Sequence, residues 1–240
     1  MTNAPKRPVR MAFTNRDGGA STEPFDSFNL GDHVGDDPAA VETNRARLAK
    51  ILGVRELVFM EQLHTPNVTE VLADHIGVGP VPATDALVTS IKDVALVVLT
   101  ADCVPLLLFD QDAKLVAAVH AGRIGARNGI VRRTVQRMVE LGATTGGIRA
   151  LMGPAASGKN YEVPREMALD VESKLPGSLT TTSAGTTGLD IRSGIERQLR
   201  SMGVTQIAMD PRCTIEDESL FSYRREGTTG RQAGVIWMPS

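Results

Sequence analysis

The central part of the chain is a series of apolar segments separated by short polar stretches. The runs ELVFMEQL, NVTEVL, DALVTS, VALVVLTAD, PLLLFD and KLVAAVH follow one another between residues 56 and 120. Most of them are apolar or β-branched throughout and do not alternate with polar residues, which is typical of strands in a sheet covered on both faces. Three later runs, IRALMG, QIAMD and AGVIWM, predict further strands at 148–153, 206–210 and 233–238.

Helical periodicity and capping residues predict four helices around this block of strands. The first is marked by Asp37 and Pro38 at its start and by Gly53 after its end. The predicted helices span 38–52, a segment that begins between 126 and 128 and ends before Gly142, 164–175, and 191–202. The Gly-rich and Asp-rich segment 18–38 is expected to form loops with at most a short edge strand, and 180–188 a short polar loop.

The order of these elements favours an α+β fold with a mixed sheet, because consecutive strands lie between helical segments without strict βαβ alternation. No repeat of fixed period and no linker-like stretch divides the chain. We therefore expect residues 1–240 to form a single catalytic domain.

Composition narrows the classes of partner. The formal net charge of -2 gives no electrostatic reason to expect a nucleic acid or an anionic membrane, so a small-molecule substrate is favoured. No uninterrupted apolar stretch approaches the length of a membrane span, and the N-terminus has no apolar core of a signal peptide. With only two cysteines, the chain is expected to be cytoplasmic with reduced thiols.

Three metal-capable side chains end apolar runs and precede turn residues: His64, Cys103 and His120. Two imidazoles and a thiolate suit zinc, or copper in its softer state, and leave a fourth position open for water or substrate. Their separations of 39 and 17 residues match no short metal motif, so they would have to converge from separate strands. A buried structural cysteine and hydrogen-bonded structural histidines are the alternative.

An ordered series of motifs covers nearly the whole chain. It consists of FTNRDGGASTEPFDSFNLGDHVGDDP with Asn44 and Arg45, the His64 segment, TADCVPLLLFD, AAVHAG, GPAASGKNYEV, DPRCT and FSYRREGTTGRQA. This series resembles the YfiH-like family, whose members are labelled multicopper polyphenol oxidases or laccase-domain proteins and are also described as purine nucleoside phosphorylases.

The resemblance implies that His64, Cys103 and His120 form a catalytic metal site, with zinc the expected ion and copper possible. It implies phosphorolysis of adenosine, inosine or methylthioadenosine to the base and ribose 1-phosphate, and a related adenosine deaminase activity. It also implies stacked mixed sheets flanked by helices, similar to the catalytic domain of a bacterial toxin deamidase that uses a Cys-His pair.

Two departures from the family pattern concern the substrate. The usual HAGWRG is His120-Ala-Gly-Arg123-Ile-Gly here, so the guanidinium lies one position earlier, and Thr65 replaces a glycine after His64. Arg16 and Arg123 are candidate substrate-binding cations. Asp102, next to the cysteine, is a further candidate, either as a proton carrier or, as we favour, by orienting a neighbouring group.

Three other functions stay open at this point. A copper-dependent, laccase-like phenol oxidase is disfavoured because a multicopper cluster needs many histidines and the chain has four. A hydrolase that edits peptidoglycan precursors would use Cys103 as a nucleophile activated by His120. A nucleoside-binding protein without catalytic activity would keep the pocket and lose turnover.

Overall fold

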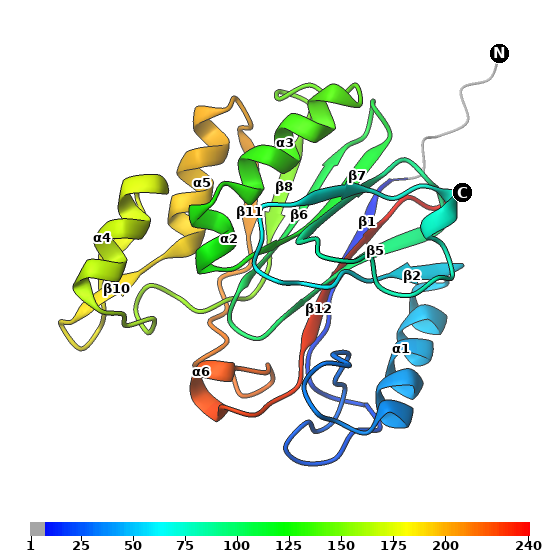
Figure 1. The fold of residues 1–240 in the computed structure, drawn as a ribbon, viewed down its shortest axis with the longest axis horizontal. Helices are drawn as coiled ribbons and strands as arrows, with labels where there is room; N and C mark the ends of the chain where they lie inside the picture. The colour runs from blue at the N-terminus through cyan, green and yellow to red at the C-terminus, as the bar shows by residue number, and fades with distance from the viewer. Residues whose placement is uncertain (1–7) are drawn as a thin grey trace.

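The apolar runs form two stacked mixed β-sheets in the computed structural model, which describes residues 8–240 (Figure 1). The larger sheet has the order β11-β8-β6-β7-β4-β3, in which β3 and β4 are parallel, as are β8 and β11, and the other neighbours are antiparallel. Its strands are β3 (Val68–Glu70), β4 (Ala86–Thr89), β6 (Val104–Asp110), β7 (Leu115–Ala121), β8 (Arg149–Met152) and β11 (Gln206–Met209).

The smaller sheet has the order β1-β12-β5-β2, with β2 parallel to β5 and the remaining pairs antiparallel. Its strands are β1 (Arg10–Phe13), β2 (Glu56–Val58), β5 (Val94–Thr100) and β12 (Gln232–Trp237). The expected α+β class with stacked mixed sheets is therefore confirmed. The first seven residues of the expected single domain lie outside the described part of the chain.

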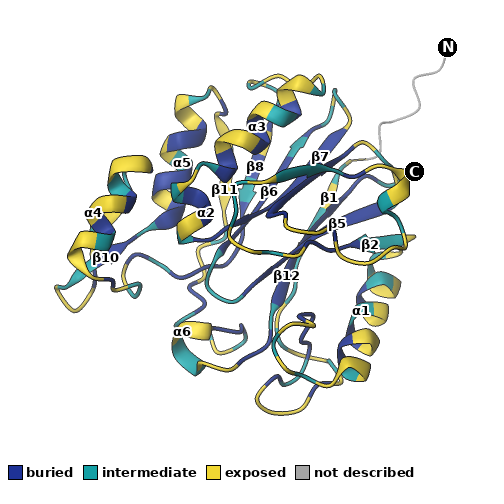
Figure 2. Ribbon diagram, in the orientation of Figure 1, coloured by how far each residue is buried: buried dark blue, intermediate teal, exposed yellow. Residues whose placement is uncertain are grey.

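Neighbouring residues of the central strands enter different apolar layers. In β6, Leu106 and Leu108 pack toward the helices, whereas Leu107 packs between the two sheets. In β5, Leu96 belongs to the layer between the sheets and Val97 to the outer layer of the smaller sheet. Both sheets are thus covered on both faces, as the continuous apolar runs predict, and Figure 2 shows these strands as buried ribbons beneath helices with one exposed side.

The helices cover the outer faces of the two sheets (Figure 1). On one side lie α2 (Arg123–Arg127), α3 (Ile130–Glu140), α4 (Arg165–Lys174) and α5 (Ile191–Ser201), and on the other lies α1 (Pro38–Leu52). Two predicted caps are present: the Asp37 side chain accepts a hydrogen bond from the Ala39 amide, and Asp190 accepts one from the Ser193 amide. α1 ends where Gly53 takes the left-handed conformation.

The structure differs from the predictions in three segments. The helix predicted to begin between residues 126 and 128 begins at Ile130 as α3, and a separate short helix, α2, precedes it; Gly129 between the two has a φ of 89°. The predicted polar loop at 180–188 contains a hairpin of β9 (Leu179–Thr181) and β10 (Thr187–Leu189). The run at 56–63 keeps only β2 as a strand, so His64 lies in a loop and not at a strand end.

Segment 18–38 contains turns and no strand. Two short helices complete the described elements, a 3-10 helix η1 (Ala73–His75) and α6 (Tyr223–Glu226). Among residues 8–240, no helix combines the length and the apolar character needed to cross a membrane.

Candidate functional site

Three separate segments bring His64, Cys103 and His120 together at one end of the stacked sheets. His64 comes from the loop between β2 and β3, Cys103 from the turn that connects β5 in one sheet with β6 in the other, and His120 from β7. Their ligand atoms all lie within 4.8 Å of one another. The Cys103 Sγ is 3.8 Å from the His64 Nε2, and the two imidazole rings meet edge to face at 4.7 Å.

A buried carboxylate, Asp85, holds two of these three residues in place. One of its oxygens, Oδ1, accepts hydrogen bonds from the His64 amide at 3.0 Å and from the His120 Nδ1 at 2.8 Å. The other, Oδ2, accepts from the amides of Leu63 and Thr65 and from the Thr65 hydroxyl. The side chain of Asp85 is fully buried, so every one of these bonds forms away from water.

The protonation state of Asp85 fixes the tautomer of His120. Burial by itself raises the pKa of Asp85, but the hydrogen bonds from His120 and Thr65 outweigh this effect and lower it. An ionised carboxylate only accepts hydrogen bonds, so the His120 Nδ1 must carry the hydrogen. The Nε2 of His120 is then the ring nitrogen left to act at the site.

Close backbone approach makes Gly122 part of the site. A Cβ atom at this position would lie 2.8 Å from the His64 Cδ2 and 2.9 Å from the Cys103 Sγ, so any side chain here would have to displace one of these two groups. His64 and Asp102 also have positive φ values, 60° and 94°, which non-glycine residues seldom adopt. The conformation of the chain around the three side chains is therefore locally strained, as is common at functional sites.

Cys103 and His120 perturb each other's protonation in opposite directions. Burial raises the pKa of the Cys103 thiol, but the charge of His120 and hydrogen bonds from both histidines outweigh it and lower the pKa to about 6. Burial lowers the pKa of His120, but the Cys103 thiolate and Asp85 outweigh it and raise the pKa to about 9. Near neutral pH the metal-free site therefore holds a thiolate beside an imidazolium.

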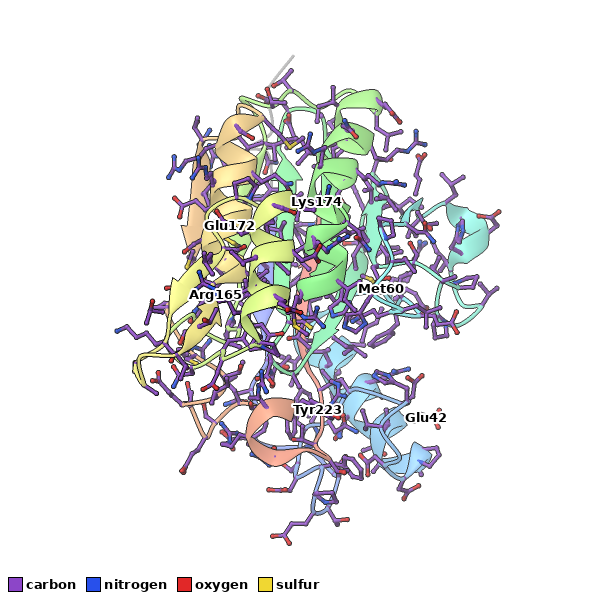
Figure 3. All side chains as sticks on the ribbon, turned by 60° about the vertical axis from the view of Figure 1, so that its left-hand side comes forward. Glu42, Met60, Arg165, Glu172, Lys174 and Tyr223 are labelled. Atoms are coloured by element: carbon purple, nitrogen blue, oxygen red, sulfur yellow. The ribbon has the colours of Figure 1, made fainter. Side chains whose placement is uncertain are left out.

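A cavity of about 450 Å³ opens beside Cys103. Its apolar lining includes Val104, Ala121 and Ile191, and two aromatic rings, Tyr161 and Tyr223, also face it. Figure 3 shows Tyr223 on the short helix α6. The volume falls within the usual range for sites that bind small organic molecules, about 300–1,000 Å³.

Charged residues at the cavity include Arg123, Arg224 and Asp102. The Asp102 Oδ1 accepts hydrogen bonds from the hydroxyls of Thr214 and Ser222, and its Oδ2 accepts one from the Arg224 amide. Its main-chain carbonyl accepts one from the Ala156 amide. Asp102 thus ties two segments of the cavity wall, at Ala156 and at Arg224, and the neighbouring Thr214 to the turn that carries Cys103.

Arg16 lies elsewhere, in a second and more open cavity. Its guanidinium pairs with Asp26 and with Glu226, at 3.3 Å and 2.8 Å, and stacks over the ring of Phe221. The structure therefore does not bring Arg16 into the cavity beside Cys103, and these partners account for its position.

The other two histidines also lie apart from the three side chains. His33 pairs with Asp32, and His75 pairs with Asp74. Within residues 8–240, His64, Cys103 and His120 are the one group of metal-capable side chains that converges in this way.

Sequence reasoning missed Asp85, Gly122 and Arg231. An acidic residue at the start of the apolar run DALVTS was a signal for Asp85, because a carboxylate there needs buried donors. Arg231 lies near enough to Cys103 and Asp102 for their charges to act on it, although burial is the main influence and lowers its pKa. Arg224, which lines the cavity, belongs to the same segment, FSYRREGTTGRQA.

Comparison with known proteins places this geometry in a family. The family described as multi-copper polyphenol oxidoreductase laccase matches residues 10–239. A Corynebacterium glutamicum protein named purine nucleoside phosphorylase is 63% identical over 235 residues, which cover 97% of this chain and 96% of that protein.

Two solved structures have the same fold over almost their whole length. YlmD from Geobacillus stearothermophilus superposes with a TM-score of 0.91 at 32% identity, covering 97% of this chain and 92% of that one. The hypothetical protein YfiH from Bacillus licheniformis gives 0.90 at 30% identity, covering 98% and 97%. The chain therefore belongs to the multi-copper polyphenol oxidoreductase laccase family, the YfiH-like proteins.

Proposed function

We propose that this protein is a purine nucleoside phosphorylase whose catalytic centre is formed by His64, Cys103 and His120. The observation that carries the proposal is the convergence of these three side chains next to a cavity of nucleoside size, which Cys103 lines, in a chain 63% identical to a protein of that name. The substrates would be adenosine, inosine or methylthioadenosine together with phosphate.

The donor set fits zinc. In a tetrahedral site, bonds of about 2.0–2.3 Å to His nitrogen and Cys sulfur place neighbouring ligand atoms roughly 3.3–3.6 Å apart. The 3.8 Å between the Cys103 Sγ and the His64 Nε2 is close to that separation. The lowered pKa of Cys103 supplies a thiolate, and the hydrogen bond to Asp85 directs the second ring nitrogen of His120 toward the same point. Copper is compatible with the same donors.

A zinc ion held by His64, Cys103 and His120 would supply a Lewis acid beside the cavity. In the phosphorolysis, the bond between ribose C1′ and the base nitrogen breaks, a phosphate oxygen bonds to C1′, and the departing base takes up a proton. The rings of Tyr161 and Tyr223 in the cavity lining are suited to pack against a purine. Asp102 would act by positioning these walls and not by transferring a proton, because both of its oxygens already accept hydrogen bonds.

The test is product analysis with zinc-loaded protein and each of the three nucleosides, with and without phosphate. The proposal predicts phosphate-dependent release of free base and ribose 1-phosphate, lost in Cys103→Ala. Cys213→Ala is the matched control, since it removes a thiol outside the group of three. Formation of inosine and ammonia from adenosine without phosphate would add the deaminase activity. No turnover of any nucleoside would contradict the proposal.

A Cys-His hydrolase is the second candidate, and the thiolate-imidazolium pair of Cys103 and His120 favours it. Hydrolysis of peptidoglycan-derived peptides by metal-free protein, lost in Cys103→Ala, would support it against the phosphorylase. For a laccase-like oxidase, the two histidines of the site are too few for a multicopper cluster. Tight nucleoside binding without turnover would identify a binding protein.

A further inference from the structure

The cavity beside Cys103 has two cations in its lining, Arg123 and Arg224, in a chain whose net charge is -2. Of the two anions in the lining, the Cys103 thiolate is paired with the His120 imidazolium, and Asp102 is the carboxylate. Both oxygens of Asp102 are engaged by hydrogen-bond donors of the protein itself. An anionic ligand, or an anionic part of a ligand, is therefore favoured in this cavity.

The two arginines differ in how firmly they are held. The Arg224 Nη2 donates a hydrogen bond of 2.6 Å to the carbonyl of Glu162, and its guanidinium lies 5.2 Å from the centre of the Tyr161 ring. The main-chain amide of Arg224 is also bonded to Asp102. Arg224 is thus part of a fixed wall in which cation and aromatic ring are stacked.

Arg123, in contrast, is half-buried at the cavity and forms no hydrogen bond or ion pair with any residue in the described range 8–240. Asp170 is close enough to feel its charge, but both oxygens of Asp170 are already bound by Arg127 at 2.6 Å. A half-buried guanidinium without a partner has all five of its donors available for a ligand.

The chain fixes Arg123 next to the three-residue centre. Gly122, the preceding residue, lies so close to His64 and Cys103 that a Cβ atom there would be within 2.9 Å of the cysteine sulfur. An anion held by Arg123 would therefore lie beside the three-residue centre.

We propose that Arg123 binds the phosphate co-substrate, while the stacked pair of Arg224 and Tyr161 forms the wall that contacts the nucleoside. This division of the cavity rests on the proposed phosphorylase function. The planar fork of a guanidinium matches two oxygens of a phosphate, which an ammonium group cannot do in the same geometry. Arg231 is the competing cation, but it does not line the cavity, and its Nη1 is bonded to the carbonyls of Thr229 and Gly230.

Steady-state kinetics with each substrate varied separately test this division. Arg123→Gln should raise the KM for phosphate about tenfold or more, the value expected for loss of hydrogen bonds to a charged group, and leave the KM for the nucleoside within about twofold. Arg123→Lys should recover only part of the loss. Arg224→Gln should instead raise the KM for the nucleoside. Arg132→Gln, an exposed charge on α3, is the matched control and should change neither.

Direct binding of inorganic phosphate, measured by isothermal titration calorimetry at equal zinc content, separates this proposal from the proposed function. Phosphate binding that is lost in Arg123→Gln, in a protein that does not turn over nucleosides, would support the anion site and contradict the phosphorylase. Unchanged phosphate affinity and unchanged KM for phosphate in Arg123→Gln would overturn the assignment of Arg123, even if the wild type is a phosphorylase. A rise in the KM for phosphate in Arg231→Gln alone would overturn it in favour of Arg231.

Discussion

Replacement of Asp85 by asparagine changes one atom and disturbs most of the site. With the amide oxygen at the Oδ2 position, the bonds from Leu63 and Thr65 survive. The amide NH₂ then faces the His64 amide and the His120 Nδ1, which are both donors. The clash is relieved if His120 moves its hydrogen to Nε2, and that tautomer cannot bind a metal through Nε2. In the opposite orientation, the amide oxygen still accepts hydrogen bonds from the His64 amide and the His120 Nδ1. The NH₂ group then faces the three donors from Leu63 and Thr65.

Either orientation leaves buried donors facing each other. Leaving a hydrogen bond to a charged group unmade in the interior costs about 1.5–3 kcal/mol, and breaking a buried ion pair about 3–5 kcal/mol. Asp85 is fully buried and its partner His120 is nearly so. We expect Asp85→Asn to lower the free energy of unfolding of the metal-free protein by about 2–4 kcal/mol. Loss of the residue that orients a ligand should weaken zinc binding by about 10- to 100-fold.

Urea unfolding and zinc competition with a chromophoric chelator measure the two effects. Asp110→Asn is the matched control, because Asp110 is also buried and accepts hydrogen bonds from main-chain amides, at the far end of β6. It should reduce stability and leave zinc affinity unchanged. If Asp85→Asn bound zinc within twofold of the wild type and lost less than about 1 kcal/mol, the assigned role of Asp85 would be wrong.

The remaining predictions concern the thiol, the glycine beside it and the loop at 20–29. Because the pKa of Cys103 is lowered to about 6, the rate of its alkylation by iodoacetamide in metal-free protein should rise through about pH 6 and level off by about pH 8. The variant Cys103→Ser reports the background from Cys213. A midpoint of the rate near pH 8.5 would refute the thiolate. Gly122→Ala should abolish high-affinity zinc binding and leave the circular dichroism spectrum that of the wild type, because the new Cβ would collide with His64 and the Cys103 sulfur. Retained zinc affinity would contradict the close approach of Gly122 to these two side chains. Asn44→Ala should lower the free energy of unfolding in urea by about 2–4 kcal/mol, because the buried side-chain amide of Asn44 forms four hydrogen bonds with the loop at 20–29. A decrease of less than about 1 kcal/mol would show that other contacts hold the loop.

Features set by neighbouring residues could be predicted from the sequence. α1 has its signals inside its own segment, with Asp37 and Pro38 at the start and a left-handed Gly53 after the end. The central strands could be recognised because burial on both faces leaves continuous apolar runs. The convergence of His64, Cys103 and His120 followed from ligand chemistry together with the family resemblance, since their spacing alone matches no motif.

Features that depend on tertiary contacts could not be predicted in this way. The hairpin of β9 and β10 is rich in Thr and Gly, and it forms only with outside contacts, which include the preceding helix α4 and a bridge between Glu162 and Gly188. In the sequence, Asp85 is only the first residue of an apolar run. Its role depends on the loop at 63–65, whose amides donate hydrogen bonds to its carboxylate in the folded protein. Whether Arg16 or Arg123 reaches the cavity depends on where distant segments place Asp26 and Glu226, which engage Arg16.

The central claim is that His64, Cys103 and His120 act as one metal-binding catalytic unit. The most direct measurement is the zinc content and the phosphorolysis rate of the same samples of the wild type, the three single alanine variants and the triple variant. The account predicts that each single replacement removes both zinc and ribose 1-phosphate formation, and that the triple variant is no less active than the single ones, because residues that act as a unit are not additive. Full activity in a variant that lacks stoichiometric zinc, or zinc-loaded wild type that forms no ribose 1-phosphate, would contradict it.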